Sequence, residues 1–199
     1  VAEEFIVALK ELNFRAEKIP NFIEINNTLK NTTGWTIKTV PNISPPEEFF
    51  SYLSKKKFTT TCWLRSMSQI DYLEEPDMFH DVFAHVPLLS NKEYTSFFKE
   101  IGQIAMSVID DPIKLKKLQR IYWFTIEFGL IKKHDKFKIY GAGIISSKEE
   151  SKNVLSNKSK KKEFDVKRVM NHSFKIDVVQ ETYYYIDSFE ELTLSLDEI

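Results

Sequence analysis

The spacing of apolar residues predicts helices over the first part of the chain, interrupted by short extended segments. Apolar positions recur every three or four residues in segments 2–12 and 22–29. The PPEE sequence at 45–48 has the prolines and acids of a helix start. Apolar and polar residues alternate in segment 35–40, which predicts a short strand, and segment 58–64 is predicted to be extended.

The same reading predicts two long helices further on, at residues 92–109 and 112–133, separated by a DDP sequence. Segment 138–145 contains Gly141 and Gly143 and suits a tight turn or a close approach of backbone. Shorter elements are predicted after it, namely helices at 147–155, 165–171 and 188–199, a lysine-rich solvated loop at 158–162, and an antiparallel hairpin of 174–179 with 183–186. No repeat or linker divides the chain, so we predict one mainly α domain over residues 1–199 with a few short strands.

Composition excludes some classes of partner. The 199 residues carry a net charge of −1, which argues against nucleic acid or an anionic membrane as a partner. Cys62 is the only cysteine, so no intrachain disulfide can form. No apolar run approaches the roughly 20 residues of a membrane helix, and no signal peptide is visible, so we expect a cytoplasmic protein. The chain begins at Val1, from which we expect part of the natural N-terminus to be missing.

Two histidines, His80 and His85, are the first candidates for chemistry. On a straight α-helix a spacing of five places them about 140° apart, so they would not face one ion. We predict a helix that starts near Pro76 and ends near His85, because Pro87 biases the preceding residue away from α geometry, and His85 can then turn toward His80. The alternative is two ordinary histidines. A zinc-hydrolase motif needs a spacing of four and a Glu after the first histidine, and this pair has neither.

Glu127 lies in the apolar sequence YWFTIEFGL, residues 122–130. A carboxylate is costly to bury there without a partner, which leaves a salt bridge to Lys or Arg, or a metal ion. Trp123 precedes it by four residues and shares its helical face. Two imidazoles and one carboxylate are the ligand set of a ferrous facial triad, which leaves three coordination positions open.

Three longer stretches resemble the pterin-dependent aromatic amino acid hydroxylases, and most of all the bacterial phenylalanine 4-hydroxylases. They are DYLEEPDMFHDVFAHVPLL at 71–89, IYWFTIEFGL at 121–130 and IYGAGIISS at 139–147, with weaker matches at 33–41 and 181–189. The resemblance thus covers nearly the whole chain in order. Ala84 departs from it, because the family usually has Gly before the second histidine. The LE pair at 73–74 follows the bacterial pattern.

The resemblance implies a helical catalytic domain and a mono-oxygenase that uses Fe²⁺, a tetrahydropterin and dioxygen to hydroxylate an aromatic amino acid, with L-phenylalanine favoured. Tyrosine or tryptophan hydroxylation, and a degenerate relative that binds without turnover, are the alternatives within the family; a zinc hydrolase is the alternative outside it. A monomer is expected. The implied site comprises the iron ligands His80, His85 and Glu127, the carboxylate-binding Arg65 with its supporting Asp77, the substrate-side residues Trp123, Phe128, Gly143 and Ser146, and the pterin-side residues Phe49, Asp81 and Tyr122, of which Tyr122 also lies near the iron.

Overall fold

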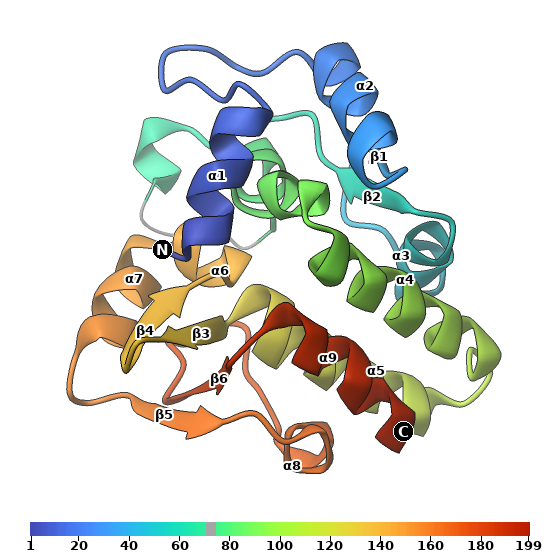
Figure 1. The fold of residues 1–199 in the computed structure, drawn as a ribbon, viewed down its shortest axis with the longest axis vertical. Helices are drawn as coiled ribbons and strands as arrows, with labels where there is room; N and C mark the ends of the chain where they lie inside the picture. The colour runs from blue at the N-terminus through green and yellow to red at the C-terminus, as the bar shows by residue number, and fades with distance from the viewer. Residues whose placement is uncertain (71–74) are drawn as a thin grey trace.

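The computed structural model describes residues 1–70 and 75–199, and helices dominate it (Figure 1). The prediction of a mainly α fold is confirmed. The LE pair at 73–74 and the start of the 71–89 stretch lie outside the described residues. The α-helices are α1 (Glu3–Glu11), α2 (Phe22–Thr32), α3 (Pro46–Ser54), α4 (Lys92–Ser107), α5 (Pro112–Tyr122), α6 (Ala142–Ile145), α7 (Lys148–Leu155), α8 (Val166–Asn171) and α9 (Phe189–Ser195). Short 3-10 helices are η1 (Met67–Gln69), η3 (Val86–Ser90) and η5 (Leu196–Glu198).

Polar side chains fix where the central helices begin. The Asn91 side chain accepts a hydrogen bond from the Tyr94 amide at the start of α4, and Asp111 accepts from the first amides of α5. The apolar face of α4 is fully buried, where it packs against α3 and α9. In Figure 1, α4 runs through the middle of the molecule between two small sheets. None of the described helices is long and apolar enough to cross a membrane.

In the described part of the chain the strands form two sheets, mostly with parallel neighbours. β1 (Thr36–Thr39) pairs in parallel with β2 (Lys57–Thr60). The second sheet has the order β4-β3-β6-β5, with bounds β3 (Gly129–Lys133), β4 (Lys136–Ile139), β5 (Lys160–Glu163) and β6 (Thr182–Ile186). In it β3 and β4 are antiparallel, whereas β6 is parallel to both β3 and β5.

Three sequence predictions are wrong in this sheet. The predicted hairpin of 174–179 with 183–186 does not form, because β6 already has β3 and β5 as parallel neighbours. The predicted helix 112–133 is too long, because the helical segment ends at Glu127 and the buried strand β3 begins at Gly129. The apolar sequence there could not show this, since a run of apolar residues is typical of a buried strand and of a buried helix alike. The lysine-rich segment is partly the edge strand β5 rather than a loop, and lysines suit an edge because they discourage pairing with other chains.

Two π-helices, η2 (Phe79–His85) and η4 (Trp123–Glu127), carry the candidate metal ligands. Hydrogen bonds in a π-helix join residues five apart, so positions i and i+5 come to nearly the same face. The predicted frayed end at His85 is therefore wrong. Val86 is itself helical (φ −59°, ψ −36°) and Pro87 sits at the start of η3, where a missing amide hydrogen costs little.

Gly141 permits the close backbone contact that supports Glu127. Its amide donates to the Gly129 carbonyl at 3.0 Å. A Cβ at Gly141 would lie 2.4 Å from the Glu127 carbonyl oxygen and 2.6 Å from the Gly129 amide nitrogen. Both contacts are with backbone, which cannot move aside alone, so the close approach predicted from the glycines at 141 and 143 is confirmed here.

Gly141→Ala is expected to lower the free energy of unfolding by about 3 kcal/mol, the upper part of the usual range for overpacking. Gly34→Ala is the comparison, because a Cβ there meets only the flexible Lys56 side chain, at 3.4 Å, in a left-handed backbone with φ +78°. That strain alone costs about 1–2 kcal/mol. Chemical denaturation of both variants measures the difference. Equal stabilities would contradict the close contact at Gly141.

Candidate active site

Three side chains from the two π-helices converge on one point. The Nε2 atoms of His80 and His85 are 3.1 Å apart. The Glu127 carboxylate places Oε1 3.1 Å from His85 Nε2 and Oε2 3.5 Å from His80 Nε2. All are largely buried, with exposed side-chain fractions of 16%, 2% and 13% for His80, His85 and Glu127. The partner that Glu127 needed is thus a pair of histidines facing the same space.

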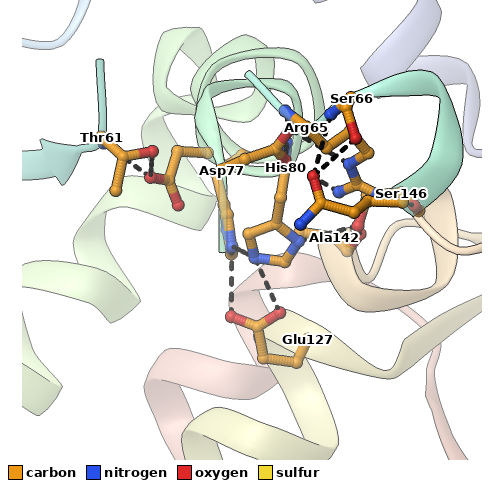
Figure 2. A network of polar contacts seen from close by, with 11 residues as sticks. Thr61, Arg65, Ser66, Asp77, His80, Glu127, Ala142 and Ser146 are labelled. Atoms are coloured by element: carbon orange, nitrogen blue, oxygen red, sulfur yellow. Dashed lines mark hydrogen bonds and ion pairs between the residues drawn. The ribbon is translucent and has the colours of Figure 1, made fainter. Parts of the chain in front are cut away.

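Ser146 determines which nitrogen of His80 carries the proton. Its hydroxyl donates to the Ala142 carbonyl at 2.8 Å and therefore accepts from His80 Nδ1, 2.7 Å away (Figure 2). His80 then has its proton on Nδ1 and a free lone pair on Nε2, directed toward Glu127. Hydrogen bonds of this kind orient the histidine ligands of metal ions.

The local electrostatics favour a neutral His80 and an ionised Glu127. Burial lowers the pKa of His80, which keeps its ring neutral. Burial alone would raise the pKa of Glu127, but electrostatic attraction to the two histidine rings and a hydrogen bond from His85 hold this pKa below its usual range. A neutral imidazole and an ionised carboxylate are the forms that bind a metal ion.

The donor set and its spacing fit a first-row divalent metal. Ligand atoms about 2.1 Å from an ion are about 3.0 Å apart along an octahedral edge, close to the separations seen here. The three ligand atoms thus outline one face of an octahedron, and the opposite side is a cavity. The three residues form a group able to hold a metal ion.

Arg65 lies beside this site and is held rigidly by Asp77. Its Nε and Nη2 donate to the two oxygens of the Asp77 carboxylate, at 3.0 and 2.8 Å, and its backbone amide adds a third bond at 2.9 Å. Asp77 is fully buried and also accepts from the His80 amide at 3.1 Å, so one carboxylate aligns Arg65 with a metal ligand. Burial would raise the pKa of Asp77, but the bonds from Arg65 hold it below its usual range.

A cavity of 860 Å³ opens in front of the three ligands. Of the twelve residues that the sequence assigned to the site, eleven line the cavity; only Asp77, behind Arg65, does not. Rings form two of its sides. Trp123 packs on Phe128 with ring centroids 4.7 Å apart, and Phe49 packs edge-on against Tyr122 at 5.3 Å. A Cβ at Gly143 would lie 2.8 Å from the Phe128 ring, so glycine allows this ring its place.

The structure adds to the site that was assigned from the sequence. It gives further contacts to two predicted residues, Ser146 and Asp81, and it brings in one residue that was not predicted, Thr61. Besides its hydroxyl bond to His80, Ser146 offers its carbonyl to Arg65 Nη1 at 3.4 Å, so it serves both the metal side and the carboxylate side. Asp81 accepts from the amide and the hydroxyl of Thr61, at 2.7 and 2.9 Å. Burial raises the pKa of Asp81. Thr61 was missed because a lone threonine outside any motif gives no signal in one sequence.

A family model described as "biopterin-dependent aromatic amino acid hydroxylase" matches residues 2–198 of the chain. The chain belongs to this family. Two relatives support the membership, both named phenylalanine-4-hydroxylase. The one from Ralstonia nicotianae is 44% identical over 191 residues, which are 96% of this chain and 61% of that protein. The one from Chromobacterium violaceum is 42% identical over 193 residues, or 96% of this chain and 64% of that protein.

Solved structures of the Chromobacterium violaceum phenylalanine hydroxylase have the same fold as this hydroxylase family member. The structure with bound iron(III) and oxidised 7,8-dihydrobiopterin has a TM-score of 0.94 at 40% identity, covering all of this chain and 73% of that one. The structure bound to cobalt also has a TM-score of 0.94, at 41% identity, covering 98% of this chain and 70% of that one. The chain spans less than two thirds of the length of the two relatives described above.

Proposed function

We propose that this chain is an iron- and tetrahydropterin-dependent mono-oxygenase that hydroxylates the ring of an aromatic L-amino acid, with L-phenylalanine as the favoured substrate. The observation that carries the proposal is the convergence of His80, His85 and Glu127 on one side of a cavity. The relatives named phenylalanine-4-hydroxylase, and the solved structure of one of them with iron and dihydrobiopterin, support both the metal and the cosubstrate.

Bound iron and reduced pterin supply the oxidising chemistry that activates dioxygen, which no protein side chain can supply alone. In this proposal His80, His85 and Glu127 hold the iron on one face and leave the cavity side open to small molecules. Ser146 keeps the proton of His80 on Nδ1, so Nε2 presents its lone pair to the metal.

Arg65 is proposed to bind the carboxylate of the amino acid. A guanidinium suits this task because its planar array of N–H donors matches the two oxygens of a carboxylate. Asp77 engages Nε and Nη2 from behind, which fixes the plane of the group before substrate arrives. The arginine lines the same cavity as the metal ligands, so a molecule held by its carboxylate extends its ring toward the metal.

The two groups of rings are proposed to separate substrate from cosubstrate. Trp123 and Phe128 surround the substrate ring, and Gly143 gives it room. Phe49 and Tyr122 form the opposite, pterin-binding side, together with Asp81, whose carboxylate Thr61 holds in place. Apolar walls of this kind exclude water and so limit side reactions at the metal.

The proposal predicts that the iron-loaded protein converts phenylalanine to tyrosine only when both dioxygen and a tetrahydropterin are supplied. Product analysis by mass spectrometry, with oxygen uptake recorded in parallel, tests this. Competition among equal concentrations of phenylalanine, tyrosine and tryptophan then identifies the preferred ring. Hydrolytic activity with zinc and none with iron and pterin would contradict the proposal in favour of a zinc hydrolase. Ligand binding without any product would favour a degenerate relative.

A further inference from the structure

Gln180 is a buried residue (7% exposed) between α8 and β6, and its side-chain amide makes three hydrogen bonds. The oxygen Oε1 accepts from the indole Nε1 of Trp123 at 3.2 Å. The nitrogen Nε2 donates to the carbonyls of Lys175 and Val178, at 3.0 Å each. An indole N–H can only donate and a carbonyl can only accept, so these partners fix the orientation of the amide. Both the oxygen and the nitrogen of the amide are therefore engaged in hydrogen bonds.

The backbone of Gln180 is equally well held. Its amide donates to Glu150 Oε1 at 2.9 Å, and its carbonyl accepts from Asn153 Nδ2 at 2.8 Å. The Tyr183 hydroxyl donates to Glu150 Oε2 and accepts from the same Asn153 nitrogen at 2.8 Å. Side chains of α7 and β6 thus anchor Gln180, which in turn reaches the indole on η4.

The hydrogen bond to Gln180 holds the indole N–H of Trp123, whereas the rest of its ring makes apolar contacts. Its ring is stacked on Phe174, with centroids 4.3 Å apart at 15°, and tilted against Phe128 at 4.7 Å. Flat ring contacts of this kind allow an indole to slide or turn within its plane, whereas a hydrogen bond at Nε1 fixes one position. Loss of that bond would leave a partly buried N–H without its partner, which favours a different ring position.

We propose that Gln180 is a positioning residue that fixes the Trp123 indole and thereby determines which aromatic ring the cavity accepts. The inference rests on the proposed function, because Trp123 forms the ring-binding side of the cavity. Gln180 does not line the cavity itself, whereas Trp123, Phe174 and Val178 do. Its influence on substrate choice must therefore pass through the residues that it holds.

The first test observes the indole directly. The chain has three tryptophans, Trp35, Trp63 and Trp123, and therefore three indole N–H signals in a proton–nitrogen correlation spectrum. Trp123→Phe identifies the signal of Trp123 by its loss. In Gln180→Met, which removes the amide and keeps the length of the side chain, we expect the Trp123 signal alone to move and to exchange faster with solvent. Gln103→Met, an exposed change on α4, should leave all three signals in place.

The second test measures substrate choice as the ratio of kcat/KM for phenylalanine to kcat/KM for tryptophan. Loss of a fixed indole should change this ratio about tenfold in Gln180→Met, with iron content unchanged. A ratio between two substrates does not respond to a general loss of folded protein. In a Trp123→Phe background the same Gln180 change should have no further effect, because its target is gone.

The outcomes separate the inference from the proposed function. A wild-type protein that hydroxylates neither amino acid overturns the function, while the Trp123 signal still decides whether Gln180 fixes the indole. An unmoved Trp123 signal, an unchanged ratio, or an equal change of ratio in both backgrounds overturns the role of Gln180. If Gln180→Met does not fold, the test uses Trp123→Phe alone. In that variant the ratio of kcat/KM for phenylalanine to kcat/KM for tryptophan must change while the protein stays folded. An unchanged ratio overturns the inference.

Discussion

Replacing Glu127 by glutamine is expected to remove iron from the protein, and hydroxylation with it. The amide keeps the shape of the carboxylate but removes the only negative charge among three ligands whose other two members are imidazoles. We expect iron affinity to fall more than about 100-fold, because residues that only orient metal ligands already contribute about 10–100-fold. Iron per chain, measured after dialysis against a limiting free-iron concentration, checks this expectation.

Two further variants show whether the loss is specific to the ligand. Glu149→Gln removes a carboxylate that is exposed and lines the same cavity, so it tests the general charge of the cavity and should leave iron content at the wild-type level. Ser146→Ala removes the hydroxyl that holds His80 Nδ1 and should weaken iron binding about 10–100-fold. Wild-type iron affinity in Glu127→Gln would show that the carboxylate merely pairs with the two histidines.

The candidate metal site could be predicted from the sequence because its residue types are rare and chemically distinctive. A carboxylate in an apolar stretch requires a partner, and half of the four histidines lie within six residues of one another. Its geometry could not be predicted in the same way. A spacing of five is unfavourable for a shared ion on an α-helix, and the π-helix η2 brings His80 and His85 together without a frayed end.

Long-range pairings account for most of what the sequence did not reveal. The parallel neighbours of β6 come from segments far apart in the chain, and no local pattern specifies which strands pair. Gln180 gave no signal either, because a single glutamine between a valine and a glutamate is typical of a surface loop. Its importance follows only from the position of the Trp123 indole, 57 residues away in sequence.

Replacing Arg65 is expected to have the second large effect, a loss of substrate binding. The simplest substitution, Arg65→Ala, would also disturb Asp77, its buried partner. Asp77 is fully buried, and Arg65 supplies three of its hydrogen bonds. Removing the guanidinium alone leaves a buried carboxylate without its charge partner, which typically costs about 3–5 kcal/mol of stability. A loss of activity in Arg65→Ala could therefore arise from unfolding. Arg65→Lys keeps the charge but not the planar donor array, and Arg65→Ala combined with Asp77→Ala removes both members of the pair.

Both proteins are expected to bind phenylalanine on the order of a hundredfold more weakly than wild type, within the 2–5 kcal/mol typical of a buried charged contact, with iron retained. The decisive comparison is with phenethylamine, which has the ring and the amine but no carboxylate. Wild type should strongly prefer phenylalanine over phenethylamine in calorimetric titrations, whereas the double variant should bind the two equally weakly, because the group that recognised the difference is gone. A double variant that still prefers phenylalanine as strongly as wild type would mean that another residue binds the carboxylate, and the orientation of substrate proposed for this cavity would then be wrong.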